Sequence, residues 1–294
     1  MTGLKIAWIG AGKMGLPVCQ RLKAAGHDVR ILARRPEQAG KLAKLGFAVE
    51  SAVPALIGGV DVVFTCVPDD TALAGVIVND AFKAALPASA VLIDMSTVSP
   101  SISARIASHL GNDTAYLRSP VSGSTMMAEA GTLTALVSGP RDAFDAMSEV
   151  FSAFTKTAFH LGPAEQARFL KLAINSMVAA TSALLGEALA FGLKGGLTNE
   201  SMLEVITQSV VASPLIGYKK NTIISGDYTP AATLDMLKKD VDLFLSSGKD
   251  LGMPLPIGEK VKQLYEAAAS RGLGGKDFFV LVQDAARMSS SPAT

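Results

Sequence analysis

The sequence predicts an α/β fold in which a mostly parallel sheet comes first and an all-α part follows. Short apolar runs alternate with amphipathic helical segments in the first half of the chain, which is the pattern of βα units. A glycine-rich turn follows the first apolar run. From residue 163 onward the sequence has helical periodicity only. In a chain of 294 residues we therefore expect two domains, 1–162 and 163–294.

The first apolar run, Leu4–Ile9, predicts a buried strand that ends on the pattern G-x-G-x-x-G. In this pattern Gly10 permits a tight turn, Gly12 lets the backbone approach a pyrophosphate, and Gly15 lets a helix pack on a strand. A helical segment and a second strand, Asp28–Ala33, follow, so the context fits a dinucleotide site of Rossmann type rather than a merely structural turn. The expected cofactor loop comprises Gly10, Ala11, Gly12, Lys13, Met14 and Gly15.

The residues after the second strand bear on cofactor choice. An NAD site usually has an acidic residue here, which accepts a hydrogen bond from the ribose 2′-hydroxyl. This chain has Arg34 and Arg35 instead, and a guanidinium suits a 2′-phosphate. We therefore expect NADP(H), with NAD(H) possible, and the alternative is a solvated loop with two charges.

Further strands and helices continue the pattern. The expected strands are Phe47–Glu50, Asp61–Val67, Ala90–Asp94, Ala115–Leu117, Leu133–Ser138 and Thr157–Leu161, which together close one sheet. The expected helices are Ala164–Leu193, Asn199–Val211, Leu234–Leu251, Ile257–Ala269 and Lys276–Met288, followed by a disordered tail, Ser289–Thr294. Val67 with Pro68, and Thr97, follow two of the strands at their carboxyl ends, where ligands of open sheets bind.

The composition indicates which classes of partner to expect. A net charge of +1 with 18% charged residues gives no reason to expect nucleic acid or a membrane surface as a partner. Cys19 and Cys66 fall in a predicted helix and strand, so we expect reduced thiols and a cytoplasmic location. His27, His109 and His160 are far apart and lack ligand spacing, so no metal is expected.

The long apolar segment Ile174–Leu193 is long enough to span a membrane. It contains Asn175, Ser176 and Glu187, so a helix buried between domains or subunits explains it better. Its apolar surface predicts a homodimer or homotetramer in which helical domains form the contact.

Two stretches carry polar groups suited to chemistry. The segment Ser119–Ser124 offers hydroxyls and backbone N–H groups that suit a carboxylate, although a plain Ser/Gly turn reads the same way. Lys171 and Asn175 share one helix face at i, i+4. A lysine in so apolar a stretch is costly unless it is paired, and the alternative is a lysine that snorkels to water.

These motifs, in this order over nearly the whole chain, resemble the β-hydroxyacid dehydrogenase family. The glycine loop with Leu16-Pro17 is similar to the family's cofactor signature. Further matches are Pro120–Gly123 with the substrate loop, Lys171 and Asn175 with the catalytic helix, Lys239-Asp240 with the K-D pair that closes on the cofactor, and Asp277-Phe278 with the late D-[FY] element.

The resemblance implies hydride transfer between a nicotinamide and a small hydroxy acid or semialdehyde acid, of the 3-hydroxyisobutyrate, tartronate semialdehyde, glyoxylate or succinic semialdehyde type. It implies Lys171 as the proton donor and acceptor, assisted by Ser122 and Asn175. The implied substrate-binding residues are Ser122, Gly123, Ser124, Lys171 and Asn175. The implied cofactor neighbours beyond the glycine loop are Arg34, Arg35, Val67, Pro68, Thr97 and Lys239.

The chain departs from the family pattern around the substrate loop. Arg118 and Ser119 stand where the family commonly has an acid and a small residue, and Ser124 stands where glycine is usual. These departures leave the substrate open. Two alternatives also remain: an imine reductase-like enzyme, which lacks the catalytic lysine, and a non-catalytic NADP-binding protein.

Overall fold

The chain divides into two compact units in the computed structural model, which describes residues 3–290 and side chains up to residue 288. The units are Met1–Lys171 and Leu172–Thr294, so the division falls within helix α10 (Gln166–Lys194). The sequence places the boundary at 162/163 instead, where the last strand ends. The first turns of α10 belong with the sheet unit because Arg168 is buried in that unit, with 1% of its surface exposed.

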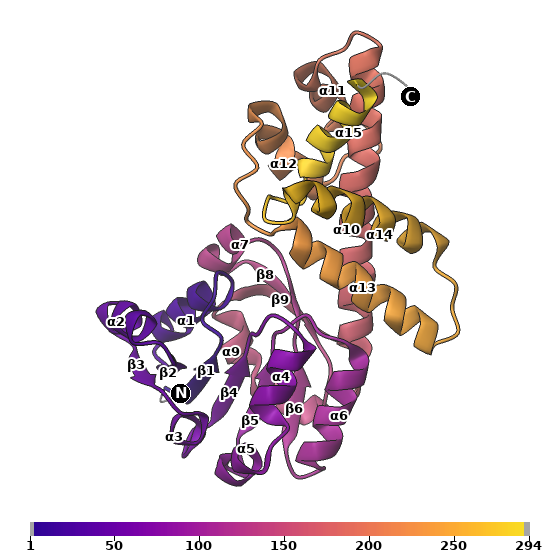
Figure 1. The fold of residues 1–294 in the computed structure, drawn as a ribbon. Helices are drawn as coiled ribbons and strands as arrows, with labels where there is room; N and C mark the ends of the chain where they lie inside the picture. The colour runs from indigo at the N-terminus through magenta and orange to yellow at the C-terminus, as the bar shows by residue number, and fades with distance from the viewer. Residues whose placement is uncertain (1–2, 291–294) are drawn as a thin grey trace. The chain divides into compact units, whose positions relative to one another are not determined.

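The first unit is built on a six-stranded parallel sheet in the order β3-β2-β1-β4-β5-β6 (Figure 1). Its strands are β1 (Lys5–Ile9), β2 (Asp28–Leu32), β3 (Ala48–Glu50), β4 (Val62–Thr65), β5 (Val91–Asp94) and β6 (Ala115–Arg118). The strand order reverses at β1, which pairs with β2 on one side and β4 on the other. Ligands of such sheets bind at the carboxyl ends of the strands near this reversal. The glycine loop follows β1 at this position.

Helices connect the strands of this unit. They are α1 (Gly15–Ala24), α2 (Pro36–Lys44), α3 (Val53–Ile57), α4 (Asp70–Ile77), α5 (Asp80–Ala85), α6 (Pro100–Leu110), α7 (Thr125–Ala130), α8 (Arg141–Ala146) and α9 (Ser148–Ser152). Four of them begin at side-chain caps: Asp69 accepts from Ala72 N, Asn79 from Phe82 N, Ser99 from Ile102 N, and Ser124 from Met127 N. Such caps satisfy N–H groups that a helix start leaves unpaired.

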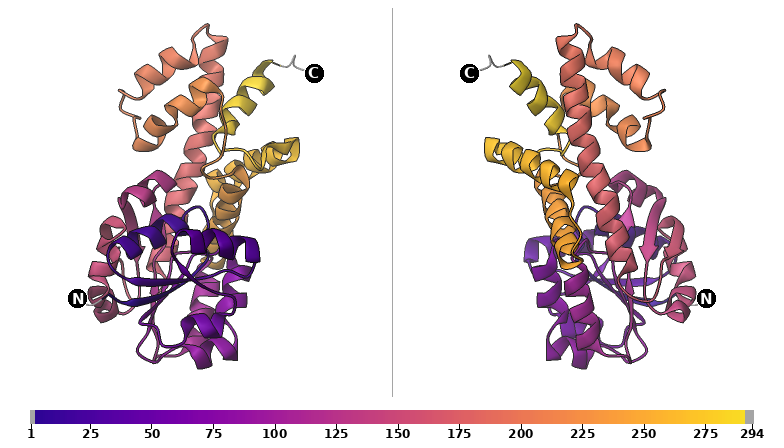
Figure 2. Two further views of the ribbon diagram at one scale, coloured as in Figure 1. Left: turned by 90° about the vertical axis from the view of Figure 1, so that its left-hand side faces the viewer. Right: turned by 90° about the vertical axis from the view of Figure 1, so that its right-hand side faces the viewer.

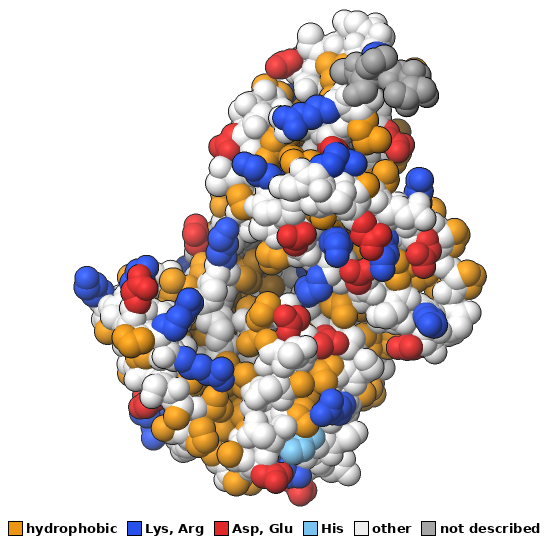
Figure 3. Space-filling model, in the orientation of Figure 1, with side chains coloured by type: hydrophobic (Ala, Val, Ile, Leu, Met, Phe, Trp, Pro, Cys, Tyr) orange, Lys and Arg blue, Asp and Glu red, His pale blue; other side chains and the backbone are white. Residues whose placement is uncertain are grey.

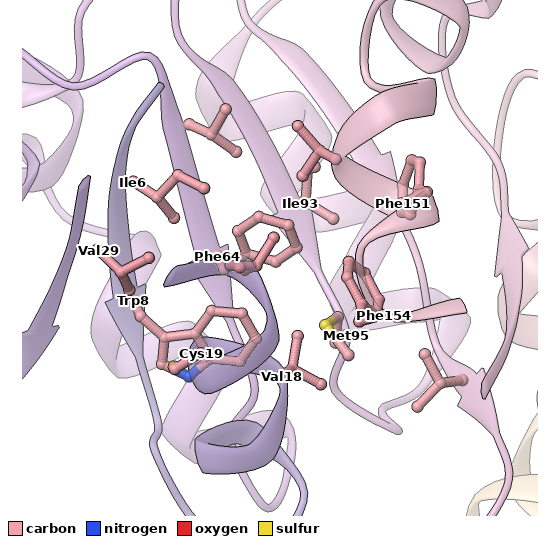
Figure 4. Close-up of a cluster of buried hydrophobic side chains, with 14 of the residues drawn as sticks. Ile6, Trp8, Val18, Cys19, Val29, Phe64, Ile93, Met95, Phe151 and Phe154 are labelled. Atoms are coloured by element: carbon pink, nitrogen blue, oxygen red, sulfur yellow. The ribbon is translucent and has the colours of Figure 1, made fainter. Parts of the chain in front are cut away.

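Both faces of the sheet are buried, because alternate residues of each strand enter different clusters. Ile6 and Trp8 of β1 lie in the cluster drawn in Figure 4, whereas Ala7 and Ile9 belong to the cluster on the other face. Trp8 stacks on Phe64 with 4.9 Å between ring centroids. Strands buried on both faces are typical of parallel sheets, and the sequence predicts a mostly parallel sheet with crossover helices.

The last strands of this unit form a second sheet rather than closing the first. It contains β7 (Val121–Ser122), β8 (Leu133–Val137) and β9 (Thr155–His160). β7 runs antiparallel to β8, and β8 runs parallel to β9. The sequence predicts that the last two strands complete one mostly parallel sheet and that 121–122 is a loop, and both expectations are wrong. A two-residue strand is too short to show an alternating pattern, and separate sheets leave no mark in the hydrophobic periodicity.

The second unit is helical, and its first element continues from the sheet unit. Its helices are α10, α11 (Asn199–Ile206), α12 (Pro214–Ser225), α13 (Leu234–Asp250), α14 (Pro256–Ala268), the π-helical η1 (Ala269–Leu273) and α15 (Val280–Ser290). Figures 1 and 2 show α10 as one unbroken helix. A parallel sheet followed by a helical unit that starts on a long helix confirms the predicted fold class.

The helical unit differs from the prediction at several places. The sequence does not predict α12, although Ser213 caps it and Pro214 occupies its first turn. The predicted helix Lys276–Met288 begins only at Val280, because the segment before it makes a bridge between Asp277 and Thr233. Helix α15 reaches Ser290, so the predicted disordered tail is wrong at 289–290, and residues 291–294 lie outside the described part.

A buried ion pair holds the segment before α15. Lys219 Nζ on α12 lies 2.5 Å from Asp277 Oδ2, and the two side chains are 4% and 1% exposed. The ammonium also lies 5.0 Å from the centroid of the Phe278 ring. Removing one partner of such a pair leaves an uncompensated buried charge, so each of the two residues depends on the other at this position.

Positive and negative side chains are mixed on the face of the molecule in Figure 3, where Lys and Arg side chains are interspersed with Asp and Glu side chains.

Helix α10 is the one described helix long and apolar enough to cross a membrane. Of its most apolar window, 44% is buried within the protein, and core helices of soluble proteins meet the same criterion.

Candidate active site

Glycine shapes the loop between β1 and α1. Gly10 has a φ of +102°, and a Cβ there would lie 2.1 Å from the carbonyl oxygen of Cys66. A Cβ on Gly15 would lie 2.4 Å from the carbonyl oxygen of Gly10. At Gly12 a Cβ would meet no described atom within 4 Å. The loop is therefore closed at Gly10 and Gly15 and open at Gly12, where the motif requires the backbone to approach a pyrophosphate.

The start of α1 is suited to an anion. No side chain caps this helix, and its first turn contains no acidic residue. The N–H groups of a helix start carry a partial positive charge, which favours a phosphate at this position. Helices α4, α5, α6 and α7 of the same unit have side-chain caps, whereas α2, α3, α8 and α9 lack them as α1 does. The loop and the uncapped helix together fit a dinucleotide.

A hydrogen-bond network joins the carboxyl ends of β4 and β5. Asp94 Oδ1 accepts from Thr65 Oγ1 at 2.7 Å and from Ser96 Oγ at 2.6 Å. Ser96 Oγ in turn accepts from the backbone N of Val67 at 2.9 Å. Val67 with Pro68 and Thr97, which follows Ser96, are the residues expected to border the cofactor. The network therefore holds the two loops that carry them.

Arg168, on the first turn of α10, completes this network. Its guanidinium pairs with Asp94 Oδ2 and donates to the carbonyl oxygen of Ser96 at 2.5 Å and to the Tyr116 hydroxyl at 3.2 Å. The Arg168 and Asp94 side chains are 1% and 0% exposed. The sequence prediction names neither residue. The available signal was an arginine flanked by Ala167 and Phe169 at the start of an apolar helix.

Lys171 lies one turn beyond Arg168 on α10 and is half-buried. It is the last residue of the sheet unit, so it shares a compact unit with the glycine loop and with the loops after β4 and β5. Asn175 lies a further turn along the helix, in the second unit. The i, i+4 spacing of the two residues on one helix is as predicted.

Within the second unit, Asp240 connects two of the predicted site residues. Asn175 Nδ2 donates to Asp240 Oδ2 at 2.6 Å, and Lys239 Nζ lies 2.9 Å from Asp240 Oδ1. Asn175 and Asp240 are both buried, at 8% and 6% exposed. Asp240 is part of the K-D motif, but the prediction assigns a role only to Lys239. The structure adds Asp240 as the residue that orients Asn175.

Residues of the segment Ser122–Ser124 have structural roles that the prediction does not include. Ser122 ends β7. Gly123 has a φ of +136°, and a Cβ there would lie 2.7 Å from Leu133 Cδ2, so this position requires glycine. The Ser124 hydroxyl caps α7 by accepting from the backbone N of Met127 at 3.4 Å. Ser124 is thus a helix cap, a role that the prediction does not include.

Arg118, one of the departures from the family pattern, is neutralised by an acid just before α10. Its Nε and Nη2 lie 2.9 and 2.5 Å from Glu165 Oε1. The two side chains are 7% and 13% exposed, and the guanidinium lies over the Tyr116 ring at 4.2 Å from its centroid. Because this charge is already paired, Arg118 does not supply an uncompensated cation to the neighbouring loop.

Arg34 and Arg35 lie between β2 and α2, and both are exposed. The position after β2 is where a Rossmann-type site contacts the adenosine ribose. Within residues 3–290, no group of three or more His, Cys, Asp or Glu side chains has the geometry of a metal site.

Family models match both parts of the chain. Residues 5–162 match the NAD binding domain of 6-phosphogluconate dehydrogenase, and residues 166–284 match the NAD-binding domain of NADP-dependent 3-hydroxyisobutyrate dehydrogenase. The chain is 31% identical over 286 residues to 2-(hydroxymethyl)glutarate dehydrogenase of Eubacterium barkeri, covering 95% of this chain and 94% of the relative. It is 32% identical over 276 residues to L-threonate dehydrogenase of Cupriavidus necator, covering 92% and 93%.

The fold also matches solved structures over nearly its whole length. A structure of 3-hydroxyisobutyrate dehydrogenase from Mycobacterium tuberculosis with L-serine superposes with a TM-score of 0.87 at 24% identity. The match covers 96% of this chain and 99% of that one.

Proposed function

Because the chain belongs to the β-hydroxyacid dehydrogenase family and is an NAD(P)-dependent oxidoreductase, we propose that it reduces a small semialdehyde acid or keto acid with NADPH and oxidises the matching hydroxy acid with NADP⁺. The observation that carries the proposal is the position of Lys171. It stands on a helix whose first turn is bonded to the loop after β5, and that loop is in turn bonded to the loop after β4. A proton donor is therefore fixed in the same unit as the dinucleotide loop.

The glycine loop and the start of α1 would hold the pyrophosphate of the cofactor, and Arg34 with Arg35 would hold its 2′-phosphate. Val67, Pro68 and Thr97 would border the nicotinamide ribose. When bound, the cofactor supplies or accepts the hydride. Lys239 is proposed to reach the cofactor from α13.

The chain's own part in the reaction is to bind the carboxylate and to move a proton. Ser122 and Gly123 are proposed to bind the carboxylate, and the Asn175 amide to orient the reacting oxygen. As the carbonyl carbon is reduced, its oxygen becomes negative and needs a positive charge and a proton. The Lys171 ammonium can supply both, and the neutral amine takes the proton back in the oxidation direction.

Identifying the substrate requires a panel of candidate compounds, because relatives at about 30% identity are named for different hydroxy acids. Purified enzyme with NADPH or NADH should be tested by nicotinamide absorbance with glyoxylate, succinic semialdehyde, tartronate semialdehyde and methylmalonate semialdehyde. A cyclic imine is tested beside them, and we expect turnover with at least one of the four acids. Turnover confined to cyclic imines supports the imine reductase alternative, and NADPH binding without any turnover supports a non-catalytic protein.

The enzyme is proposed to act as a homodimer or a dimer of dimers, joined through α10. Met177, Leu184 and Phe191 are 70%, 69% and 84% exposed. Their seven-residue spacing places them on one face of the helix, which is the spacing of a helix–helix seam. A stripe of this size is unusual on a monomer surface, and a second copy would cover it. The free thiols Cys19 and Cys66 support a reducing compartment, for which we propose the cytoplasm.

A further inference from the structure

We propose that the buried Arg168–Asp94 pair is a positioning device, which sets the place of Lys171 relative to the loops that border the nicotinamide. The inference rests on the proposed function, because it takes Lys171 as the proton donor. Arg168 touches neither cofactor nor substrate in this scheme. It acts through the helix that it anchors.

Hydrogen bonds to several neighbouring groups fix the orientation of the pair. The Arg168 guanidinium reaches Asp94 Oδ2, the Ser96 carbonyl oxygen and the Tyr116 hydroxyl. The other Asp94 oxygen accepts from Thr65 Oγ1, from Ser96 Oγ and from the backbone N of Ser96 at 3.0 Å. Arg168 is thus bonded directly to β5, to the loop that follows it and to β6, and β4 joins the network through Thr65 and Asp94.

Stability alone does not explain a charged pair at this position. Replacing a buried ion pair by apolar side chains of similar volume is often neutral or stabilising, because burial desolvates both charges. Apolar contacts are non-directional, whereas a guanidinium has fixed donor directions. What the pair adds over an apolar contact is therefore a defined geometry.

The Arg168–Asp94 pair is connected both to a loop expected to border the nicotinamide and to Lys171. Ser96 Oγ links Asp94 to the backbone N of Val67, in a loop expected to border the nicotinamide. Lys171 follows Arg168 by three residues, so it lies about 4.5 Å further along the helix axis. A tilt at Arg168 therefore moves the Lys171 ammonium relative to the cofactor loops. A displacement of about 1 Å in a reacting group can cost about a hundredfold in rate.

Two variants test the proposal. Arg168→Lys keeps the charge and loses the forked geometry, and the double variant Arg168→Gln/Asp94→Asn removes both charges and leaves no unpaired ion. We expect kcat to fall at least about tenfold in each. NADPH affinity, measured by nicotinamide fluorescence, should stay close to that of the wild type. The deuterium isotope effect on kcat with 4-deuterated NADPH should rise, because hydride transfer becomes more rate-limiting.

A matched control is Arg271→Lys in the second unit. Arg271 also forks onto a carboxylate, with Nε 2.9 Å from Asp284 Oδ1, and it lies outside the sheet unit. This variant should keep the wild-type kcat. If Arg168 served stability alone, its variants would lower the melting temperature while the folded enzyme kept its kcat and isotope effect, and that result would overturn the proposal.

A readout that needs no turnover separates this proposal from the proposed function. The amide hydrogen of Val67 is bonded to Ser96 Oγ, so its exchange with solvent should speed up at least about tenfold in Arg168→Lys relative to the control. Wild-type enzyme that reduces none of the panel refutes the function, whereas unchanged Val67 exchange refutes the positioning role. If Arg168→Lys does not fold, the neutral double variant carries both measurements.

Discussion

Asn175 donates its side-chain amide to Asp240 across 2.6 Å, within the helical unit. An amide nitrogen carries two hydrogens and the amide oxygen accepts separately. One N–H is therefore committed to Asp240, and the second N–H and the oxygen remain for other partners. Because Asp240 also pairs with Lys239 at 2.9 Å, a change at Asp240 affects two predicted site residues at once.

Lys171→Ala should lower kcat by at least about a hundredfold, which is the usual size of a lost acid–base group. NADPH affinity should stay within a few fold, because the groups proposed to bind its phosphates lie in the glycine loop and at Arg34 and Arg35. Lys171→Arg should fail as well, since a guanidinium does not release its proton near neutral pH. Steady-state kinetics with the best substrate of the panel, beside NADPH titrations by fluorescence, measure both effects.

Asn175→Ala serves as the control for this series and should cost less than Lys171→Ala, because an amide orients the oxygen but does not titrate. Asp240→Ala should resemble Asn175→Ala and in addition weaken NADPH binding through Lys239. Near-normal turnover in Lys171→Ala would remove the lysine from the mechanism and favour the imine reductase alternative.

Features of the fold that depend on neighbouring residues were predictable. The glycine spacing, the apolar strand runs and the uninterrupted helical pattern up to about Leu193 are local signals, and each appears in the structure. Pairings between distant residues were not. Arg168 and Asp94 are 74 positions apart, and Lys219 and Asp277 are 58 apart, so no local period brings them together.

The same reasoning explains what was missed near the site. Ser124 and Asp240 both stand in motifs that the sequence shows, yet their bonds depend on where α7 begins and on how α13 packs. A motif indicates which residues matter without stating which of them contact ligand and which support a neighbour. Substrate identity depends on which side chains contact the ligand, and the motifs do not state this. The substrate was therefore not predictable from the sequence.

Leu184→Glu should convert the proposed dimer into a monomer, because a charge at the centre of the exposed stripe on α10 has no partner once buried. Light scattering at micromolar concentration gives the mass directly. Val210→Glu is the control, since Val210 is fully exposed and lies off the stripe. A monomer mass for the wild type would contradict the dimer, and an unchanged mass in Leu184→Glu would place the contact elsewhere.

Arg34→Ala/Arg35→Ala should raise the KM for NADPH and leave that for NADH nearly unchanged, because only NADPH has a 2′-phosphate. A hydrogen bond to a charged group contributes roughly 1.5–3 kcal/mol, or about ten- to a hundredfold in affinity. Lys41→Ala on α2 removes one exposed positive charge nearby and should leave the ratio of the two KM values unchanged. A wild-type enzyme that prefers NADH would contradict this interpretation of the loop after β2.

Cys66 should make the sheet unit less stable at alkaline pH. Desolvation, and then the nearby Asp94 carboxylate, raises the pKa of its thiol from 9.0 to about 12. Between these values the folded chain keeps a proton that the unfolded chain has lost, so the free energy of unfolding falls as pH rises. The slope from this group is at most about 1.4 kcal/mol per pH unit.

Urea unfolding of the wild type and Cys66→Ala from about pH 8 to about pH 11 isolates this effect. Buried tyrosines such as Tyr116, whose pKa desolvation also raises, act on both proteins and cancel in the difference. Trp8 is the chain's single tryptophan and is buried in the same unit, so its fluorescence reports the transition that contains Cys66. The stability of the wild type relative to the variant should be constant below pH 9 and should decline above it. A difference that stays constant up to pH 11 would show that Cys66 ionises alike in the folded and unfolded chains.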